Sequence, residues 1–166
     1  MIIIIMGVSG SGKTTVGQQL ATDLGWLYSE GDDFHSVENV AKMSRGIPLT
    51  DDDRSDWLAL ISHYIENQIK LSQHTVISCS ALKQAYRRQL QLDIELVKFV
   101  YLKGSKALII KRLQSRLGHF MKAELLASQF DALEEPENTL IVEIIHSPEQ
   151  ISENIQAYYG LGTRTE

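Results

Sequence analysis

Residues 2–15 of this chain read I-I-I-I-M-G-V-S-G-S-G-K-T-T, and this segment sets the architecture that we expect for the remainder. Its first five residues are uncharged and mostly β-branched, which is typical of a strand buried on both faces. From Gly7 onward the residues fit the pattern G-x-x-x-x-G-K-[ST]. A bare match occurs by chance, but one between a buried strand and an amphipathic helix predicts a nucleoside triphosphate site rather than a functionless turn.

The glycine-rich segment has the residue types that an anion-binding loop needs. Glycines let the backbone wrap closely round an anion, so that successive N–H groups point inward. Lys13 supplies a point charge for the β- and γ-phosphates, and the Thr14 hydroxyl can ligate Mg²⁺. The positive end of the following helix dipole faces the same anion. The residues that we expect to bind the nucleotide here are Gly7, Val8, Ser9, Gly10, Ser11, Gly12, Lys13, Thr14 and Thr15.

Strand and helix patterns alternate along the rest of the chain. The expected strands are residues 2–6, 26–28, 75–79, 96–102 and 140–145. Apolar residues at helical spacing lie between them, including Val37 and Val40 in a brief helix and Trp57 and Ile61 in a long one. Such alternation predicts a parallel sheet covered by helices. We therefore expect an α/β, three-layer P-loop NTPase fold with a five-stranded parallel sheet, helices on both faces and a small lid, in a single domain over residues 1–166.

The composition is that of an ordinary globular protein. The chain has 166 residues, 43% hydrophobic content and a formal net charge of −5, with scattered basic residues. These values give no reason to expect nucleic acid as a partner. Cys79 is the only cysteine, which favours a reducing compartment. Since no apolar run approaches the roughly 20 residues that span a bilayer, we expect a cytoplasmic protein with no membrane partner.

Two carboxylates follow the second expected strand and flank a glycine. Because ligands of open α/β sheets sit beyond the carboxyl ends of the strands, Glu30 and Asp32 are expected opposite the phosphate loop. A carboxylate here can orient a phosphoryl acceptor and take its proton, or hold Mg²⁺ through water. The third expected strand ends without the aspartate that many such enzymes use for the metal. The candidate metal residues are thus Thr14, Glu30 and Asp32, and a solvated acidic turn remains the alternative.

Basic side chains gather in the segments after the second and third expected strands. They are Lys42, Arg54, Lys83, Arg87 and Arg88. One cation on a surface is usually only solvated. Several cations near a carboxylate base instead indicate an acceptor that is itself an anion with hydroxyl groups.

Two arginines lie where a lid is expected to interrupt the helical region, at about residues 112–124. Arginines of a lid can cover the triphosphate and neutralise charge during transfer. Arg112 and Arg116 are therefore candidates for nucleotide binding, and Arg116 is also a candidate catalytic residue. Gly118 and His119 follow, and a lone histidine here is more often a hinge or packing residue than an acid or base.

Taken in order, the motifs of this chain resemble those of the bacterial-type gluconokinases. The resemblance covers most of the chain, from about residue 6 to residue 136. The motifs are G-V-S-G-S-G-K-T at 7–14, G-D-D-x-H at 31–35, N-x-x-K-M at 39–43, G-x-P-L-x-D-x-D-R at 46–54, W-L at 57–58, C-S-A-L-K-x-x-Y-R at 79–87, R-x-x-x-R-x-G-H-F-M at 112–121 and S-Q-F-x-x-L-E-x-P at 128–136. Shikimate kinases and nucleoside monophosphate kinases share the loop and fold but lack the later blocks, so the ordered set is specific.

Similarity to this family implies ATP-dependent phosphorylation of D-gluconate to 6-phospho-D-gluconate with Mg²⁺, feeding the pentose phosphate route. By analogy with related kinases, Asp32 deprotonates the acceptor hydroxyl. Lys13 and Arg116 are the cations expected to neutralise charge on the transferred phosphoryl group. Glu30 stands where the family usually has aspartate. The family often forms dimers, so a homodimer is expected by analogy. The positions expected to bind the acceptor are Asp32, His35, Lys42, Arg54, Ser80, Lys83, Arg87 and His119.

Two other functions fit parts of the same pattern. A kinase of another small hydroxy acid, such as shikimate, would share the loop, metal and base but differ in its acceptor contacts. A nucleotide-binding module without catalysis would keep the loop but would need neither Asp32, Arg54 nor the lid arginines. The C-terminal quarter matches the family poorly, so no functional residue is expected there.

Overall fold

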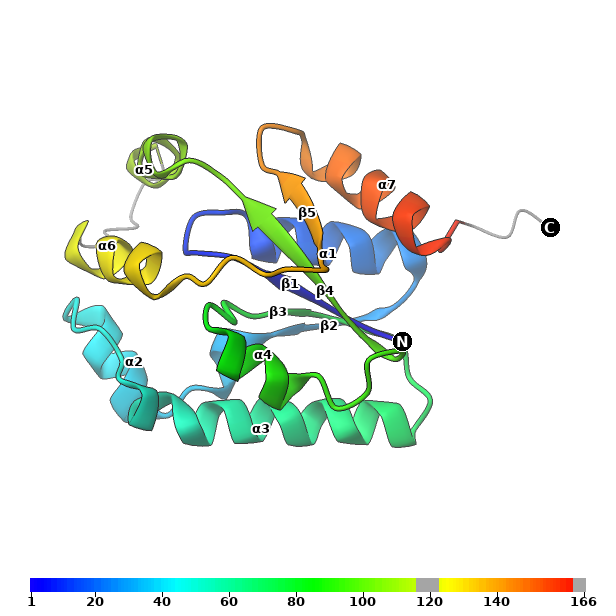
Figure 1. Cartoon of the computed structure of the whole chain (residues 1–166), viewed down its shortest axis with the longest axis horizontal. Helices are drawn as coiled ribbons and strands as arrows, with labels where there is room; N and C mark the ends of the chain where they lie inside the picture. Colours follow the sequence, from blue (N-terminus) through cyan, green and yellow to red (C-terminus); the bar gives the residue numbers. More distant parts are fainter. Residues whose placement is uncertain (116–122, 163–166) are drawn as a thin grey trace.

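The sheet of this protein is parallel, and its first strand lies in the middle. The computed structural model describes residues 1–115 and 123–162, and within them five parallel strands lie in the order β2-β3-β1-β4-β5 (Figure 1). The strands are β1 (Ile2–Met6), β2 (Leu27–Glu30), β3 (Thr75–Ser78), β4 (Val97–Lys103) and β5 (Leu140–Glu143). The predicted fold class is confirmed.

Helices cover both faces of this sheet. They are α1 (Lys13–Leu24), the 3₁₀ helix η1 (Gly31–Phe34), α2 (Val37–Ser44), α3 (Asp51–Lys70), α4 (Gln84–Leu90), α5 (Lys106–Gln114), α6 (Ala123–Ala132) and α7 (Pro148–Tyr159). Figure 1 shows α3 and α4 along one face and α1 and α7 along the other, while α2, α5 and α6 gather at the carboxyl end of the strands. Of these helices, none is both long and apolar enough to cross a membrane within the described residues.

The central strand β1 divides its side chains between two hydrophobic cores. All five of its residues are fully buried. Ile3 and Ile5 pack into the core that includes residues of α1 and α7, whereas Ile2 and Ile4 pack against α3 and α4. Successive side chains of a strand point to opposite faces, so an uninterrupted apolar run suits a strand covered on both sides. Because the phosphate loop directly follows β1, it lies at the middle of the sheet's carboxyl edge.

Local signals set the starts of the two helices nearest the site. Gly12 is the N-cap of α1 with φ of 97°, a left-handed conformation that favours glycine. At the start of α3, the Thr50 hydroxyl accepts from the Asp53 N–H at 3.1 Å and the Asp53 carboxylate accepts from the Thr50 N–H at 2.9 Å. This reciprocal capping box fixes the first turn of α3, which faces the acceptor side of the site.

Several expected strand boundaries move by one or two residues, and two apolar residues at helical spacing prove to be exposed. The second strand begins at Leu27, since Trp26 instead stacks on the His74 ring with centroids 4.8 Å apart. In α2, Val37 and Val40 are 81% and 50% exposed, so their spacing does not mark a core-facing stripe. The lid expected at residues 112–124 falls largely outside the described residues, and the single domain over 1–166 stays a prediction.

Candidate active site

The phosphate loop forms the turn between β1 and α1. Gly10 and Gly12 have φ of 82° and 97°, and a Cβ on Gly10 would lie 2.9 Å from the Leu113 side chain of α5. The loop therefore needs glycine both for its conformation and for the close approach of α5. The Lys13 ammonium donates to the Val8 carbonyl at 3.1 Å, which folds the side chain back over the loop.

The interior of the loop contains a buried hydroxyl without a partner among the described residues. Ser11 is 1% exposed, and its Oγ makes no hydrogen bond there. A Cβ on Gly7 would lie 2.8 Å from this oxygen. The Gly7 N–H donates to the Ser80 carbonyl at 3.3 Å, so the segment after β3 closes one side of the loop. A tight, glycine-built turn with an unpaired buried polar atom fits a bound polyphosphate.

Two of the three candidate metal residues, Thr14 and Glu30, are in contact at one corner of this loop. The Thr14 hydroxyl donates to Glu30 Oε2 at 2.7 Å. The Asp32 side chain, two residues further on in η1, is 70% exposed. Residues 1–115 and 123–162 hold no cluster of three or more His, Cys, Asp or Glu that would by itself bind a metal. Mg²⁺ usually keeps waters and takes only one or two carboxylates plus phosphate oxygens, so Thr14 with Glu30 fits this ion.

Asp32 stands beside a buried histidine. His35 Nε2 lies 3.9 Å from Asp32 Oδ1, and the His35 side chain is only 4% exposed. Its ring stacks on Trp57 of α3 with centroids 4.4 Å apart, and the Trp57 indole N–H donates to the Gly31 carbonyl at 2.7 Å. Burial lowers the pKa of His35, an effect that the nearby Asp32 opposes. A neutral imidazole is therefore held against the exposed carboxylate at neutral pH.

Two of the predicted acceptor-side lysines are tied to the first turn of α3. Lys42 Nζ lies 2.6 Å from Asp53 Oδ1. Lys83 Nζ lies 2.8 and 3.0 Å from the two oxygens of Asp51, and the Tyr86 hydroxyl donates to the same carboxylate. Helix α3 thereby joins α2 to the segment before α4. The predicted cations come together in space, and each lysine already has a carboxylate partner.

The two predicted arginines of this region differ in their surroundings. Arg54 donates from Nη1 to the Leu49 carbonyl at 2.7 Å and is partly exposed. Arg87 is 8% exposed, and its Nη1 donates to the carbonyls of Ala81 and Leu82 at 3.0 and 2.9 Å. Burial lowers the pKa of Arg87. This guanidinium supports the backbone after β3, so its predicted role as an acceptor ligand stays a prediction.

Arg112 lines a cavity next to the phosphate loop. The cavity has a volume of about 240 Å³ and is also lined by Gly12, His146 and Pro148. The Arg112 guanidinium donates to the Ile144 carbonyl, which holds it over this space. Its walls combine a planar cation, an imidazole and a proline, surfaces that suit a flat aromatic base. His146 and Pro148 come from the C-terminal quarter, where the sequence predicted no functional residue.

Two amide side chains near the site were also absent from the sequence predictions. Gln129 of α6 accepts from the Ser9 N–H at 2.7 Å and donates to the Ser9 hydroxyl at 3.2 Å. Asn39 of α2 donates to the Asp53 carbonyl at 2.6 Å and lies 3.4 Å from His35 Nδ1. Both occur inside the family-like motifs, which was the available signal. The predicted Arg116 and His119 lie outside the described residues.

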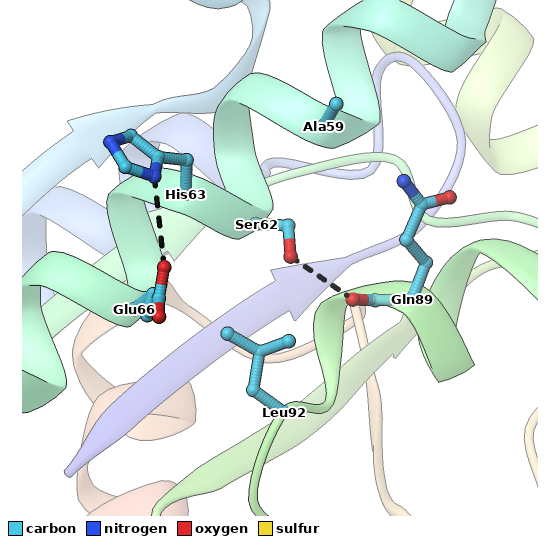
Figure 2. A pocket seen from close by; sticks show the side chains of 6 residues that line it. All are labelled: Ala59, Ser62, His63, Glu66, Gln89 and Leu92. Atoms are coloured by element: carbon cyan, nitrogen blue, oxygen red, sulfur yellow. Dashed lines mark hydrogen bonds and ion pairs between the residues drawn. The ribbon is translucent and has the colours of Figure 1, made fainter.

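A second hollow on the molecule lacks the chemistry of this site. It has a volume of about 550 Å³ and lies between α3 and α4, away from the loop. Figure 2 shows His63 directed at Glu66, 3.7 Å away, and the Ser62 hydroxyl donating to the Gln89 carbonyl at 3.3 Å. None of its six lining residues is a lysine or arginine. An anionic ligand therefore has no cation to bind there.

Comparison with known proteins identifies the family of this chain. The family model described as shikimate kinase matches residues 9–155. A gluconokinase of Gluconobacter oxydans is 51% identical over 134 residues, which cover 81% of this chain and 75% of that protein. A solved gluconokinase from Sinorhizobium meliloti has a TM-score of 0.85 at 42% identity, covering 96% of this chain and 90% of that one. A sugar kinase from Janibacter has a TM-score of 0.91 at 40% identity, covering 97% and 95%. The chain thus belongs to the gluconokinases, within the wider family of the shikimate kinase model, and is an ATP-dependent kinase.

Proposed function

We propose that this protein transfers the γ-phosphoryl group of ATP to the terminal hydroxyl of D-gluconate, giving 6-phospho-D-gluconate and ADP. The observation that carries the proposal is the exposed Asp32 carboxylate two residues after Glu30, which bonds Thr14 of the phosphate loop, together with the cations Lys42, Arg54 and Lys83 around the first turn of α3. An anionic acceptor with hydroxyl groups matches this combination. The identity of 51% to a gluconokinase supports the same acceptor.

On the nucleotide side, backbone N–H groups of residues 7–15 bind the phosphates. Lys13 stabilises the negative charge that develops on the transferred phosphoryl group. Arg112, His146 and Pro148 line the cavity in which the adenosine would lie. When bound, Mg²⁺ supplies charge neutralisation across the β- and γ-phosphates. Thr14 and Glu30 would hold it, and Asp32 would reach it through water.

On the acceptor side, Asp32 orients the hydroxyl and accepts its proton as the oxygen attacks the phosphorus. General-base help of this kind typically contributes ~10²–10⁴ in rate. His35 stays neutral because it is buried against Trp57, so it adds a hydrogen-bonding group without a competing positive charge. Arg54 pairs with the gluconate carboxylate, and Lys83 joins it while Asp51 keeps the lysine in place.

The remaining site residues have narrower roles. Ser80 borders the phosphate loop through its backbone, and Arg87 holds the turn that follows β3. Arg116 and His119 stay predictions for the lid, as do the homodimer and the cytoplasmic location.

An ADP-release assay with a panel of acceptors tests the function. D-Gluconate, D-glucose, shikimate and an acceptor-free control are compared at equal ATP and Mg²⁺. Turnover with gluconate far above all others is expected, because only gluconate combines a carboxylate with the primary hydroxyl. Preferred turnover of shikimate would overturn the acceptor while keeping the reaction class. Nucleotide binding without turnover of any acceptor would contradict the enzyme assignment.

A further inference from the structure

The phenol of Tyr28 joins three elements around the phosphate loop. Its hydroxyl lies 2.7 Å from Glu30 Oε2 and 2.9 Å from Ser78 Oγ, and it can donate to either. Ser78 in turn donates to the Lys13 carbonyl at 2.9 Å. Thr14 donates to the same Glu30 oxygen that Tyr28 reaches. Tyr28 therefore connects β2 and β3 to the first turn of α1, which carries both the lysine and the threonine of the loop.

The hydrogen bonds around Tyr28 direct its hydroxyl proton toward Glu30. A phenol has one proton and serves one acceptor at a time. A bond to an ionised carboxylate is shorter and roughly twice as strong as one between neutral groups. Ser78 uses its own proton on the Lys13 carbonyl, so it needs none from Tyr28.

Gly17 of α1 makes the room that the Tyr28 ring occupies. A Cβ at this position would lie 2.8 Å from Tyr28 Cε2 and 2.8 Å from Ser78 Oγ. Glycine inside a helix is less favourable than alanine because it has more backbone freedom to lose. At position 17 the helix nevertheless has the one residue type that lets the phenol lie against it. The close approach of ring and helix is a second, independent observation for the same arrangement.

Glu30 needs such support more than a shorter side chain would. Its carboxylate is separated from the backbone by two methylene groups, so it has more rotamers to lose than aspartate has. The residue is only partly buried, which leaves it room to move. Two donors on one oxygen, Thr14 from the loop and Tyr28 from the sheet, restrict the carboxylate from both sides.

We propose that Tyr28 is a positioning residue for the metal ion. Its hydroxyl holds the Glu30 carboxylate beside the Thr14 hydroxyl, so both groups meet Mg²⁺ already oriented. The inference rests on the proposed function, which assigns the metal to Thr14 and Glu30. Tyr28 acts through Glu30 rather than by contact with the ion.

The test measures Mg²⁺ binding without turnover. The full chain is titrated with Mg²⁺ in the presence of a fluorescent, non-hydrolysable ATP analogue, and the half-saturating Mg²⁺ concentration is compared between variants. Tyr28→Phe removes only the hydroxyl and keeps the ring against Gly17. Loss of a group that orients a metal ligand typically costs ~10–100-fold in metal affinity. We expect a rise of about tenfold in half-saturating Mg²⁺, with analogue affinity in EDTA unchanged.

Two further variants separate positioning from a general structural effect. Tyr159→Phe removes a phenol that donates to the Phe99 carbonyl at 3.0 Å, away from the loop, and should leave the Mg²⁺ titration unchanged. In a Glu30→Gln background, Tyr28→Phe should add no further shift, because its effect passes through Glu30. An unshifted titration for Tyr28→Phe, or an equal shift in the Glu30→Gln background, would overturn the inference.

The same titration separates this inference from the proposed function. If Glu30→Gln leaves the Mg²⁺ titration unchanged, both the metal assignment and the role of Tyr28 are wrong. If the shift for Tyr28→Phe is found but gluconate is not phosphorylated by the wild type, only the proposed acceptor is wrong.

Discussion

The nucleotide side and the acceptor side of this site are built in different ways. The phosphate-binding part of the nucleotide side is one continuous segment, the loop, which makes backbone contacts such as the bond from Lys13 to the Val8 carbonyl. The acceptor side is assembled from three separate segments whose side chains are joined by the pairs Lys42–Asp53 and Lys83–Asp51. Backbone conformation follows from local residues, whereas these ion pairs exist only once α2, α3 and the segment before α4 have come together.

This difference means that the two sides can be disturbed separately. A change on the acceptor side should alter turnover and acceptor choice while ATP still binds. A change in the loop should affect every acceptor alike.

The largest effect is expected from Asp32→Asn. Because the amide cannot take the hydroxyl proton, kcat should fall by ~10²–10⁴. ATP affinity, measured by direct binding, should stay near the wild-type value. Asp33→Asn, in the same 3₁₀ helix, is the matched control for loss of one carboxylate and should keep most of the activity. A parallel loss of ATP binding in Asp32→Asn would break the separation between the two sides.

The next effect is expected from Lys13→Ala. The developing charge on the transferred group loses its nearest cation, and loss of such stabilisation typically costs ~10²–10³ in rate. The loss should be equal for gluconate and for any poorer acceptor, while thermal melting shows a folded protein. Lys111→Ala in α5 controls for removal of a lysine. Near-normal turnover with unchanged nucleotide affinity would refute the assignment of the loop.

A smaller effect, confined to acceptor choice, is expected from Arg54→Ala. A hydrogen bond to a charged group contributes about 1.5–3 kcal/mol. At about 1.36 kcal/mol per decade, the preference for gluconate over glucose should shrink by roughly 10–100-fold, mainly through loss of gluconate turnover. Arg54→Lys, which keeps the charge, should lose less. Comparable kcat/KM for gluconate and glucose in the wild type would mean that no cation recognises the gluconate carboxylate.

The smallest effect is expected in acid stability. Hydrogen bonding to Lys42 lowers the pKa of Asp53 from 3.8 to about 2. A carboxylate with a depressed folded-state pKa stabilises the fold above its unfolded pKa and loses that contribution as the pH falls through the folded value. Lys42→Met should therefore reduce the fall in melting temperature between about pH 4 and pH 2. An identical pH profile for wild type and variant would show that the pair does not hold the first turn of α3.

The central strand, the loop and the start of α3 could be predicted because their signals are local. An unbroken apolar run defines β1, and the glycine pattern after it defines the loop. Thr50 and the acidic residues after it predict a helix start, and the structure has a capping box there. The order of the family-like motifs predicted the gluconokinase family, which the comparisons confirm.

Other features depend on contacts between distant segments, which the sequence pattern does not contain. Arg87 resembles the other acceptor-side cations in sequence, yet it is buried against backbone carbonyls. Val37 and Val40 have core-like spacing, yet α2 lies at the end of the sheet, and the short helix leaves them exposed. His146 and Pro148 reach the cavity beside the phosphate loop only because β5 lies beside β4.

The only thiol of the chain, Cys79, lies at the junction between β1 and β3. Cys79 directly follows β3, its N–H donates to the Ile5 carbonyl at 3.0 Å, and it is 1% exposed. Burial raises its pKa to about 12, so alkylating reagents find neither access nor thiolate in the closed protein. The rate at which Cys79 is alkylated therefore depends on how often the junction between β1 and β3 opens. Cys79 can therefore serve as a built-in probe of how often this contact opens, in the free protein and with each substrate bound.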